Sequence, residues 1–331
     1  MKKTPVFAIL TALSATLPLG CAPASNEGPF IDDSAQFAPA TPTTVAAKTP
    51  EAAPIAEKTL EAAPISEKTP TLPASTLAAL LDRGATLDKS GKSLDLSAVE
   101  TINGIDFAAD AERWNAVKVV RGKGVLTAQT LRDFAKLSNL TEFLWTDAVL
   151  AAATDADAAF AEFAKSPKLK KLRLTGLRTE AAKFPAAAFA ALAQTPQLAD
   201  IDVSGSPATA ADLAAVDWKT GFAKLTKLNL YQTQIGDAGV DALLPLADRL
   251  TSLNLDDAQI GPESAAKIAQ FSQLTFLHVG RSTLDDASIA EFAKLGKLAK
   301  IHVTRSKATE AGADALRAAL PNCEVVSQPE N

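Results

Sequence analysis

The chain has 331 residues, of which 47% are hydrophobic and 21% are charged, and its formal net charge at pH 7 is −5. This is enough apolar material for a large core, and no run of Lys and Arg suggests a phosphate-binding track, so nucleic acid is excluded as the expected partner. The only two cysteines, Cys21 and Cys323, lie near opposite ends of the chain, which excludes a disulfide-based scaffold.

Residues 1–20 have the features of a secretory signal peptide. Lys2 and Lys3 give a positively charged start, and residues 6–17 form an apolar segment too short for a membrane span of about 20 residues. The stretch that follows, LPLGC, ends at Cys21 and resembles the lipobox of bacterial lipoproteins, although Pro18 stands where Leu is usual. The resemblance implies acylation of Cys21 and a membrane-anchored domain exported to the periplasmic or surface side of the cell envelope. Cleavage after Ala24 is the alternative.

Residues 21–73 are dominated by Pro, Ala, Thr and Ser and show no apolar periodicity. Within this stretch, residues 48–57 are nearly repeated as residues 58–67. Prolines at this density disfavour helices and favour extended chain. We therefore expect a disordered tether between the anchor and the folded domain.

The folded domain, residues 74–331, is expected to begin with a cap over residues 74–92. Ser75 is placed to cap a helix over residues 76–83, and Gly84 to end it. A hairpin around Gly91 then leads into a strand at Leu94 and Leu96. A repeat array needs such a cap, because its outermost repeat otherwise exposes its core.

Eight copies of the pattern L-x-x-L-x-L follow, of which Leu225-x-x-Leu228-x-Leu230 is the clearest. Successive copies begin 24 to 29 residues apart, at Trp114, Leu140, Leu169, Leu198, Leu225, Leu250, Leu274 and Leu298. This pattern with a period of about 20–29 residues is typical of leucine-rich repeats. Each repeat then supplies one strand and one helix.

Residues 233–240, TQIGDAGV, resemble the T-x-I-x-D-A-G-L turn of bacterial leucine-rich repeats of the ribonuclease-inhibitor-like kind. The resemblance covers about residues 75–327. It implies an α/β leucine-rich-repeat solenoid, or horseshoe, with a parallel β-sheet on the concave face and α-helices on the convex face. It also implies a non-catalytic scaffold for a protein partner. Such proteins often carry Asn at the ninth repeat position, whereas small residues predominate here and Leu177 marks the least regular repeat.

Ala-rich segments after the strands predict the helices, at residues 127–136, 155–165, 186–194, 236–246, 262–271, 285–294 and 309–319. A closing strand is expected over residues 322–326, within a C-terminal cap of residues 320–331, and Cys323 is expected to be buried in it. Trp114 and Trp145 occupy inward repeat positions, so both are expected in the core.

Alternation along each strand sends repeat positions two, three, five and seven to the concave face, with position eight at its rim. Residues at one position stack into a column because neighbouring strands lie about 4.8 Å apart. The only two histidines share the fifth position of adjacent repeats. Aromatic and arginine side chains are common binding anchors. The predicted partner-binding surface therefore comprises Asn229, Tyr231, Asn254, Asp256, Asp257, Phe276, His278, Arg281, His302 and Arg305.

No hydrolase, P-loop, C-x-x-C or zinc-protease motif occurs, so no catalytic residue, cofactor or metal ligand is predicted. A zinc ion shared by His278, His302 and Asp256 is a disfavoured alternative, since Asp256 lies two residues further along a neighbouring strand. The expected partner is an unidentified protein, with a glycan less favoured. The competing functions are a structural envelope protein without a specific ligand and, less favoured, a metal-binding or hydrolytic site at the histidines.

Overall fold

The computed structural model describes residues 76–100, 102, 104–151 and 155–327. All of these residues lie in one compact unit that spans residues 67–331. The predicted signal peptide, Cys21, the tether and Ser75 lie outside the described residues. Within the described ranges, no helix combines the length and the apolarity that a membrane crossing requires.

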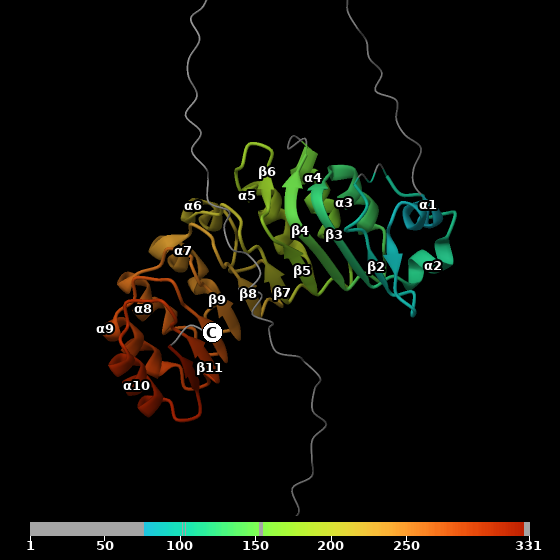
Figure 1. Cartoon of the computed structure of the whole chain (residues 1–331). Coiled ribbons are helices and arrows are strands. Elements are labelled where there is room, and N and C mark those ends of the chain that lie inside the picture. The colour runs from blue at the N-terminus through green and yellow to red at the C-terminus, as the bar shows by residue number, and fades with distance from the viewer. Residues whose placement is uncertain (1–75, 101, 103, 152–154, 328–331) are drawn as a thin grey trace, which may run out of the picture. The chain divides into compact units, whose positions relative to one another are not determined.

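The described residues form a leucine-rich-repeat solenoid in which strands and helices alternate (Figure 1). One 12-stranded sheet runs in the order β1-β2-β3-β4-β5-β7-β8-β9-β10-β11-β12, with β6 paired to β4. Only β1 and β2 are antiparallel; every other pair is parallel. The strand bounds are β1 (Thr86–Leu87), β2 (Ser93–Asp95), β3 (Val119–Leu126), β4 (Glu142–Leu150), β5 (Lys171–Leu174), β6 (Arg178–Thr179), β7 (Asp200–Asp202), β8 (Lys227–Asn229), β9 (Ser252–Asn254), β10 (Phe276–His278), β11 (Lys300–His302) and β12 (Glu324–Val326).

The helices follow the strands, as the repeat pattern predicts, and cover the convex side (Figure 1). Several end in a tighter 3₁₀ turn that continues the same segment. The bounds are α1 (Leu77–Asp82), α2 (Ala111–Ala116), α3 (Ala128–Ala135), α4 (Ala156–Phe163), α5 (Ala186–Ala191), η3 (Leu192–Gln194), α6 (Ala210–Ala214), α7 (Gly236–Leu243), η4 (Leu244–Leu246), α8 (Pro262–Ile268), α9 (Asp286–Ala290), η5 (Glu291–Lys294) and α10 (Glu310–Ala319). The repeat pattern does not predict α2 and α6.

The helix expected at the start of the folded domain is present, but it begins one residue later than predicted. Thr76 is the N-cap of α1, and its hydroxyl oxygen accepts a hydrogen bond from the backbone N–H of Ala79 at 3.1 Å. At the other end, Gly84 has a φ of 101° and donates to the carbonyl of Leu81, while Ala85 donates to that of Leu80. These two hydrogen bonds form the glycine-terminated helix end that the sequence predicts.

The predicted frame of the first repeat is wrong by three residues. Val120, and not Val117, pairs with Phe143 of the next repeat, which makes Val117 the first position. Trp114 is buried, but it belongs to α2 rather than to a strand. The error arises because Trp114, Val117 and Val119 reproduce the apolar spacing of a repeat by chance. In the corrected frame Arg121, which pairs with Leu144, occupies the fifth position of this repeat.

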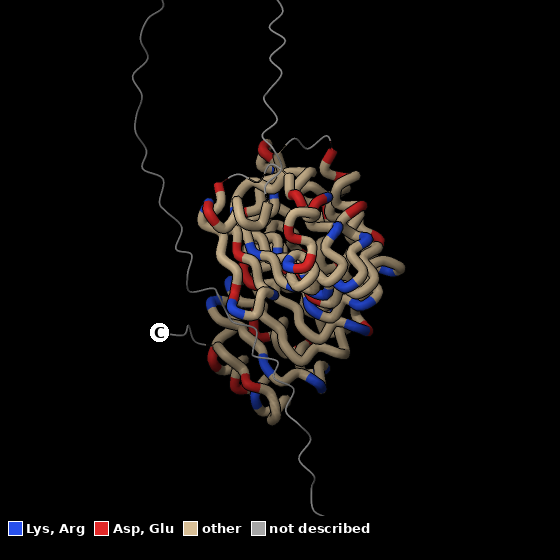
Figure 2. The backbone as a smooth tube through the Cα atoms, turned by 90° about the vertical axis from the view of Figure 1, so that its right-hand side faces the viewer, with Lys and Arg blue, Asp and Glu red and all other residues tan. Residues whose placement is uncertain are grey.

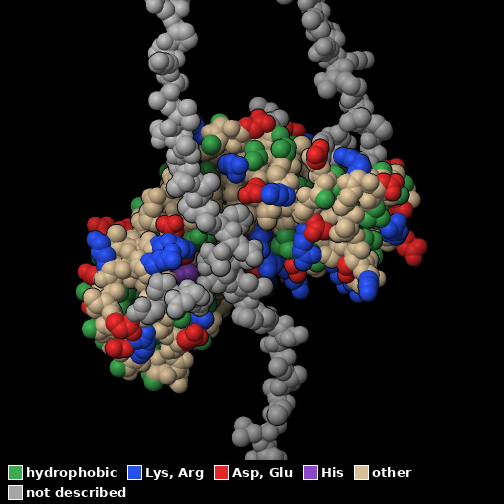
Figure 3. Space-filling model, viewed as in Figure 1, with side chains coloured by type: hydrophobic (Ala, Val, Ile, Leu, Met, Phe, Trp, Pro, Cys, Tyr) green, Lys and Arg blue, Asp and Glu red, His purple; other side chains and the backbone are tan. Residues whose placement is uncertain are grey.

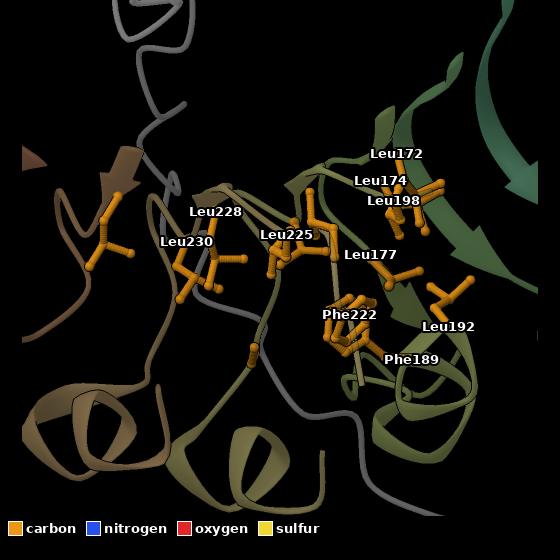
Figure 4. Packing of buried hydrophobic residues seen from close by; sticks show 14 of the residues in the cluster. Leu172, Leu174, Leu177, Phe189, Leu192, Leu198, Phe222, Leu225, Leu228 and Leu230 are labelled. Atoms are coloured by element: carbon orange, nitrogen blue, oxygen red, sulfur yellow. The ribbon is translucent and has the colours of Figure 1, made fainter. Parts of the chain in front are cut away.

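The core is a continuous layer of leucines between the sheet and the helices, with aromatic rings filling its wider parts (Figure 4). Trp145 is buried and stacks on Phe143, with ring centroids 5.4 Å apart. A Cβ atom on Gly122 would lie only 2.2 Å from the indole ring of Trp145. Trp218, to which the sequence analysis gave no role, packs against Phe222 at 5.3 Å. Cys323 is buried, as predicted, and burial raises the pKa of its thiol.

At the eighth repeat position, from the repeat of Leu140 onward, the backbone adopts a left-handed conformation. The φ values there are 50° at Asp147, 65° at Gly176, 69° at Gly205, 53° at Gln232 and Asp257, 46° at Arg281 and 55° at Arg305. The ninth position then returns to the core, where Thr233, Ser282 and Ser306 each donate a hydroxyl hydrogen bond to the sixth-position carbonyl at 2.7 Å. In these three repeats a small hydroxyl residue thus takes the place of asparagine.

Candidate functional site

The parallel register places the two histidines side by side, as predicted. His278 of β10 pairs with His302 of β11, and their ring centroids lie 4.6 Å apart. Phe276, two residues before His278 on β10, lies 5.8 Å from the His302 ring. Because alternate residues of a strand face the same side, these three rings form one aromatic group on the concave face.

Asp256 joins this group to two further predicted residues. Its carboxylate forms an ion pair with the guanidinium of Arg281, and its Oδ2 lies 3.7 Å from Nε2 of His278. The Arg281 guanidinium lies over the ring of Tyr231, 5.2 Å from its centroid, in a cation–π arrangement. Six of the ten predicted residues, here called the concave cluster, are therefore in contact: Tyr231, Asp256, Phe276, His278, Arg281 and His302.

Burial differs among the members of the concave cluster. Asp256 is 1% exposed and each histidine is 4% exposed, whereas Tyr231, Phe276 and Arg281 are half-buried. A buried carboxylate is stable only when charged or hydrogen-bonded groups surround it, which Arg281 provides here. The buried members thus fix the positions of the half-buried tyrosine and arginine. Figure 3, in the same view as Figure 1, shows a histidine side chain beside Lys and Arg side chains in the C-terminal part of the solenoid.

Asn229 and Asn254 have a structural role that the sequence analysis missed. The Oδ1 atom of Asn229 accepts a hydrogen bond from the N–H of Tyr231 at 3.0 Å, and that of Asn254 does the same for Asp256 at 2.9 Å. Asp202 holds Ser204 in the same way at 3.0 Å. The signal was present in the sequence as an Asp or Asn at the fifth position of three successive repeats, since these residues hydrogen-bond the backbone two residues on. The side-chain oxygens of both asparagines are therefore engaged in the turn.

Asp257 and Arg305 occupy eighth positions on separate repeats and lie at the strand ends rather than in the concave cluster. Asp257 is half-buried and Arg305 is exposed. Their backbone geometry is that of the turn itself, with the N–H of Asp257 donating to the carbonyl of Gly280 at 3.2 Å. The predicted surface thus consists of a connected cluster, two turn-forming asparagines and two rim residues.

The described residues contain no group of three or more His, Cys, Asp and Glu side chains arranged to hold a metal ion. His278, His302 and Asp256 are neighbours, but a zinc site needs its ligands at about 2.0–2.2 Å from one shared point. The arrangement observed instead directs Asp256 toward a guanidinium. The contacts among these side chains are ionic and aromatic.

Comparison with known proteins agrees with the repeat architecture. The family model described as Leucine Rich repeat matches residues 223–244 and 250–269. Internalin C2 of Listeria monocytogenes is similar in structure, with 19% identity, a TM-score of 0.46, and coverage of 66% of this chain and 83% of its own. A leucine-rich-repeat protein of Leptospira interrogans has 15% identity and a TM-score of 0.42, with 71% of this chain and 60% of its own covered. No curated protein shows significant similarity to this chain.

Proposed function

We propose that this leucine-rich-repeat chain is a non-catalytic recognition module that binds a protein partner through the C-terminal half of its concave face. The observation that carries the proposal is the concave cluster. Tyrosine and arginine are the residues that most often dominate binding energy at protein interfaces, above all where they are packed and partly desolvated. Here the two are in contact with each other and are held by a buried carboxylate.

The location of the chain forms the second part of the proposal. The apolar leader and the lipobox-like LPLGC sequence support export and acylation of Cys21 in a bacterial envelope. Replacing Cys21 by Ser is expected to abolish incorporation of a labelled fatty acid and to release the chain from the membrane fraction. Unchanged labelling would contradict acylation at this residue.

The binding proposal is tested by capture of proteins from an envelope extract. Chains with Tyr231→Ala and Arg281→Ala together should lose the partner that the unmodified chain captures. The matched control carries Thr175→Ala and Arg173→Ala, which remove side chains from the seventh and fifth positions of an N-terminal repeat. Loss in the control as well, or in neither variant, would place the contact elsewhere or favour a structural protein without a specific ligand.

A further inference from the structure

The edge of the solenoid at which the strands begin is formed by two columns of residues. One column is the second repeat position, where the backbone N–H of each repeat donates to the second-position carbonyl of the repeat before it. This chain of bonds links Lys118, Thr141, Lys170, Ala199, Thr226, Thr251, Thr275 and Ala299, with N–O distances of 2.7 to 2.9 Å. The column is therefore continuous across eight repeats.

The other column is the residue immediately before each first position. Two neighbouring pairs of its side chains are in contact, because Lys168 Nζ lies 2.6 Å from Oδ1 of Asn139 and Lys297 Nζ lies 2.5 Å from Oε1 of Gln273. Across both columns six residues are cationic and none is acidic, although acids outnumber bases by 38 to 33 in the whole chain. The cations are Lys118, Lys168, Lys170, Lys224, Arg249 and Lys297. We call these columns the basic edge.

The five lysines of the basic edge are exposed. Among the described residues none of them forms an ion pair, in contrast to Lys136 and Lys294 at nearby helix ends, which lie 2.8 and 2.5 Å from carboxylates. Arg249 differs, because its guanidinium donates to the carbonyls of Trp218 and Gly221. The positive charge that faces solvent here is therefore carried by lysines alone.

Acidic residues collect at the opposite edge, where the strands end and the helices begin. The first helical turns contain Asp157, Asp212, Asp237, Glu263, Asp286 and Glu310. In Figure 2 the Lys and Arg segments crowd the right-hand side of the tube below its middle, whereas Asp and Glu segments are more frequent at its top. The helix dipole accounts for acids at helix starts. It does not account for the five lysines of the basic edge, which lie outside the helices, one or three residues before a strand.

We propose that the basic edge binds the surface of an anionic lipid bilayer and orients the solenoid on it. Lysine ammonium groups act as mobile point charges, whereas recognition of a defined phosphate or carboxylate typically uses the fixed fork of arginine. The five lysines are spread along two columns and do not converge on a pocket. Such a row suits a laterally extended surface of negative headgroups. The basic edge and the concave cluster share no residue, so the two proposed contacts do not compete for the same side chains.

The test measures vesicle binding by the full chain with Cys21→Ser, which removes any acyl chain. Its binding to phosphatidylcholine vesicles with and without phosphatidylglycerol is compared, so that the neutral vesicles report any insertion of the apolar leader. A variant with Lys168→Glu, Lys170→Glu and Lys224→Glu should bind the anionic vesicles on the order of 100-fold more weakly, or roughly fivefold per cation. Raised salt should weaken the binding of the unmodified edge, because these charges are exposed.

The matched control replaces Lys123, Lys183 and Lys307, three exposed lysines away from the basic edge, by Glu. It has the same net charge as the edge variant and should retain most of the binding. Thermal melting of both variants establishes that they are folded. Equal loss in the two variants would overturn the proposal in favour of net charge alone. Binding to soluble polyphosphate but not to anionic vesicles would overturn it in favour of a polyanionic polymer.

Discussion

The concave face is built differently in its N-terminal and C-terminal halves. On β5 and β7, charged side chains meet opposite charges across the strands: Arg173 Nε lies 3.0 Å from Asp202, and Lys171 Nζ lies 3.8 Å from Asp200. On β8 to β11, aromatic, histidine and amide side chains replace most of these charges. The ion pair of Asp256 and Arg281 contacts the tyrosine and imidazole side chains there.

The two halves place their paired charges at different repeat positions, the third and fifth on β5 and β7 but the seventh and eighth for Asp256 and Arg281. Charges that alternate from strand to strand neutralise one another and hold the sheet in register, but they leave little net potential for a partner. An arginine packed on a tyrosine presents both a charge and an apolar surface, which is the composition typical of binding anchors. The proposed recognition surface therefore lies in the second half, where charge and apolar surface are presented together.

The largest expected effect concerns the aromatic core of the N-terminal half. Trp145→Ala removes a buried indole that stacks on Phe143 and donates from Nε1 to the carbonyl of Gly124 at 3.1 Å. We expect the free energy of unfolding in urea to fall by about 3–5 kcal/mol, because a cavity replaces a large side chain. Partner capture by the folded fraction should be unchanged. A loss below about 1 kcal/mol would contradict the close packing of this ring.

The two Arg–Asp pairs allow a direct comparison of the halves. Asp256→Ala leaves Arg281 without its carboxylate, and Asp202→Ala does the same to Arg173. Each change should lower the free energy of unfolding by about 1–3 kcal/mol. Only Asp256→Ala should also weaken capture of the protein partner. If both variants capture the partner equally well, the assignment of recognition to the C-terminal half is wrong.

A smaller effect is expected at the turn-forming asparagines. Asn254→Ala leaves the N–H of Asp256 without its side-chain acceptor. We expect a loss of about 1 kcal/mol in urea unfolding, the usual net contribution of one hydrogen bond. Asn254→Asp keeps the acceptor oxygen and should retain most of the stability. An equal loss in both variants would show that the amide nitrogen, and not the turn, matters.

The smallest effect concerns Asp200, whose pKa is raised because burial disfavours its carboxylate, although Lys171 and Lys227 oppose this. A raised folded-state pKa means that the folded chain holds this proton more tightly than the unfolded chain does. The contribution to stability is therefore full below the unfolded value of 3.8 and is lost as the pH rises through the folded value. Asp200→Asn should raise the melting temperature at neutral pH slightly and flatten its pH dependence. A lower melting temperature at neutral pH would show that the pair with Lys171 outweighs burial.

The repeat period predicts most of the fold. Inward leucines at a spacing of 24 to 29 residues predict a strand and a turn for every repeat from Leu140 onward, and a helix for all of these repeats except the one that begins at Leu198, because side-chain direction alternates along a strand and each repeat packs on its neighbours. The same reasoning predicts that His278 lies beside His302 on the neighbouring strand, as the structure shows. It failed where the spacing was coincidental, at Trp114, and where a short helix lacked a long periodic run, as at α6.

The sequence alone determined which residues share the concave face, since the period sets the direction of each side chain. The contacts that those residues form there are seen only in the folded structure. Asp256 forms an ion pair with Arg281, Asn229 and Asn254 accept hydrogen bonds in the turns, and Trp145 packs against Gly122. The reason is that periodicity specifies a direction, whereas contact depends on rotamers and on the residues of neighbouring repeats, which lie about 25 positions away in the chain.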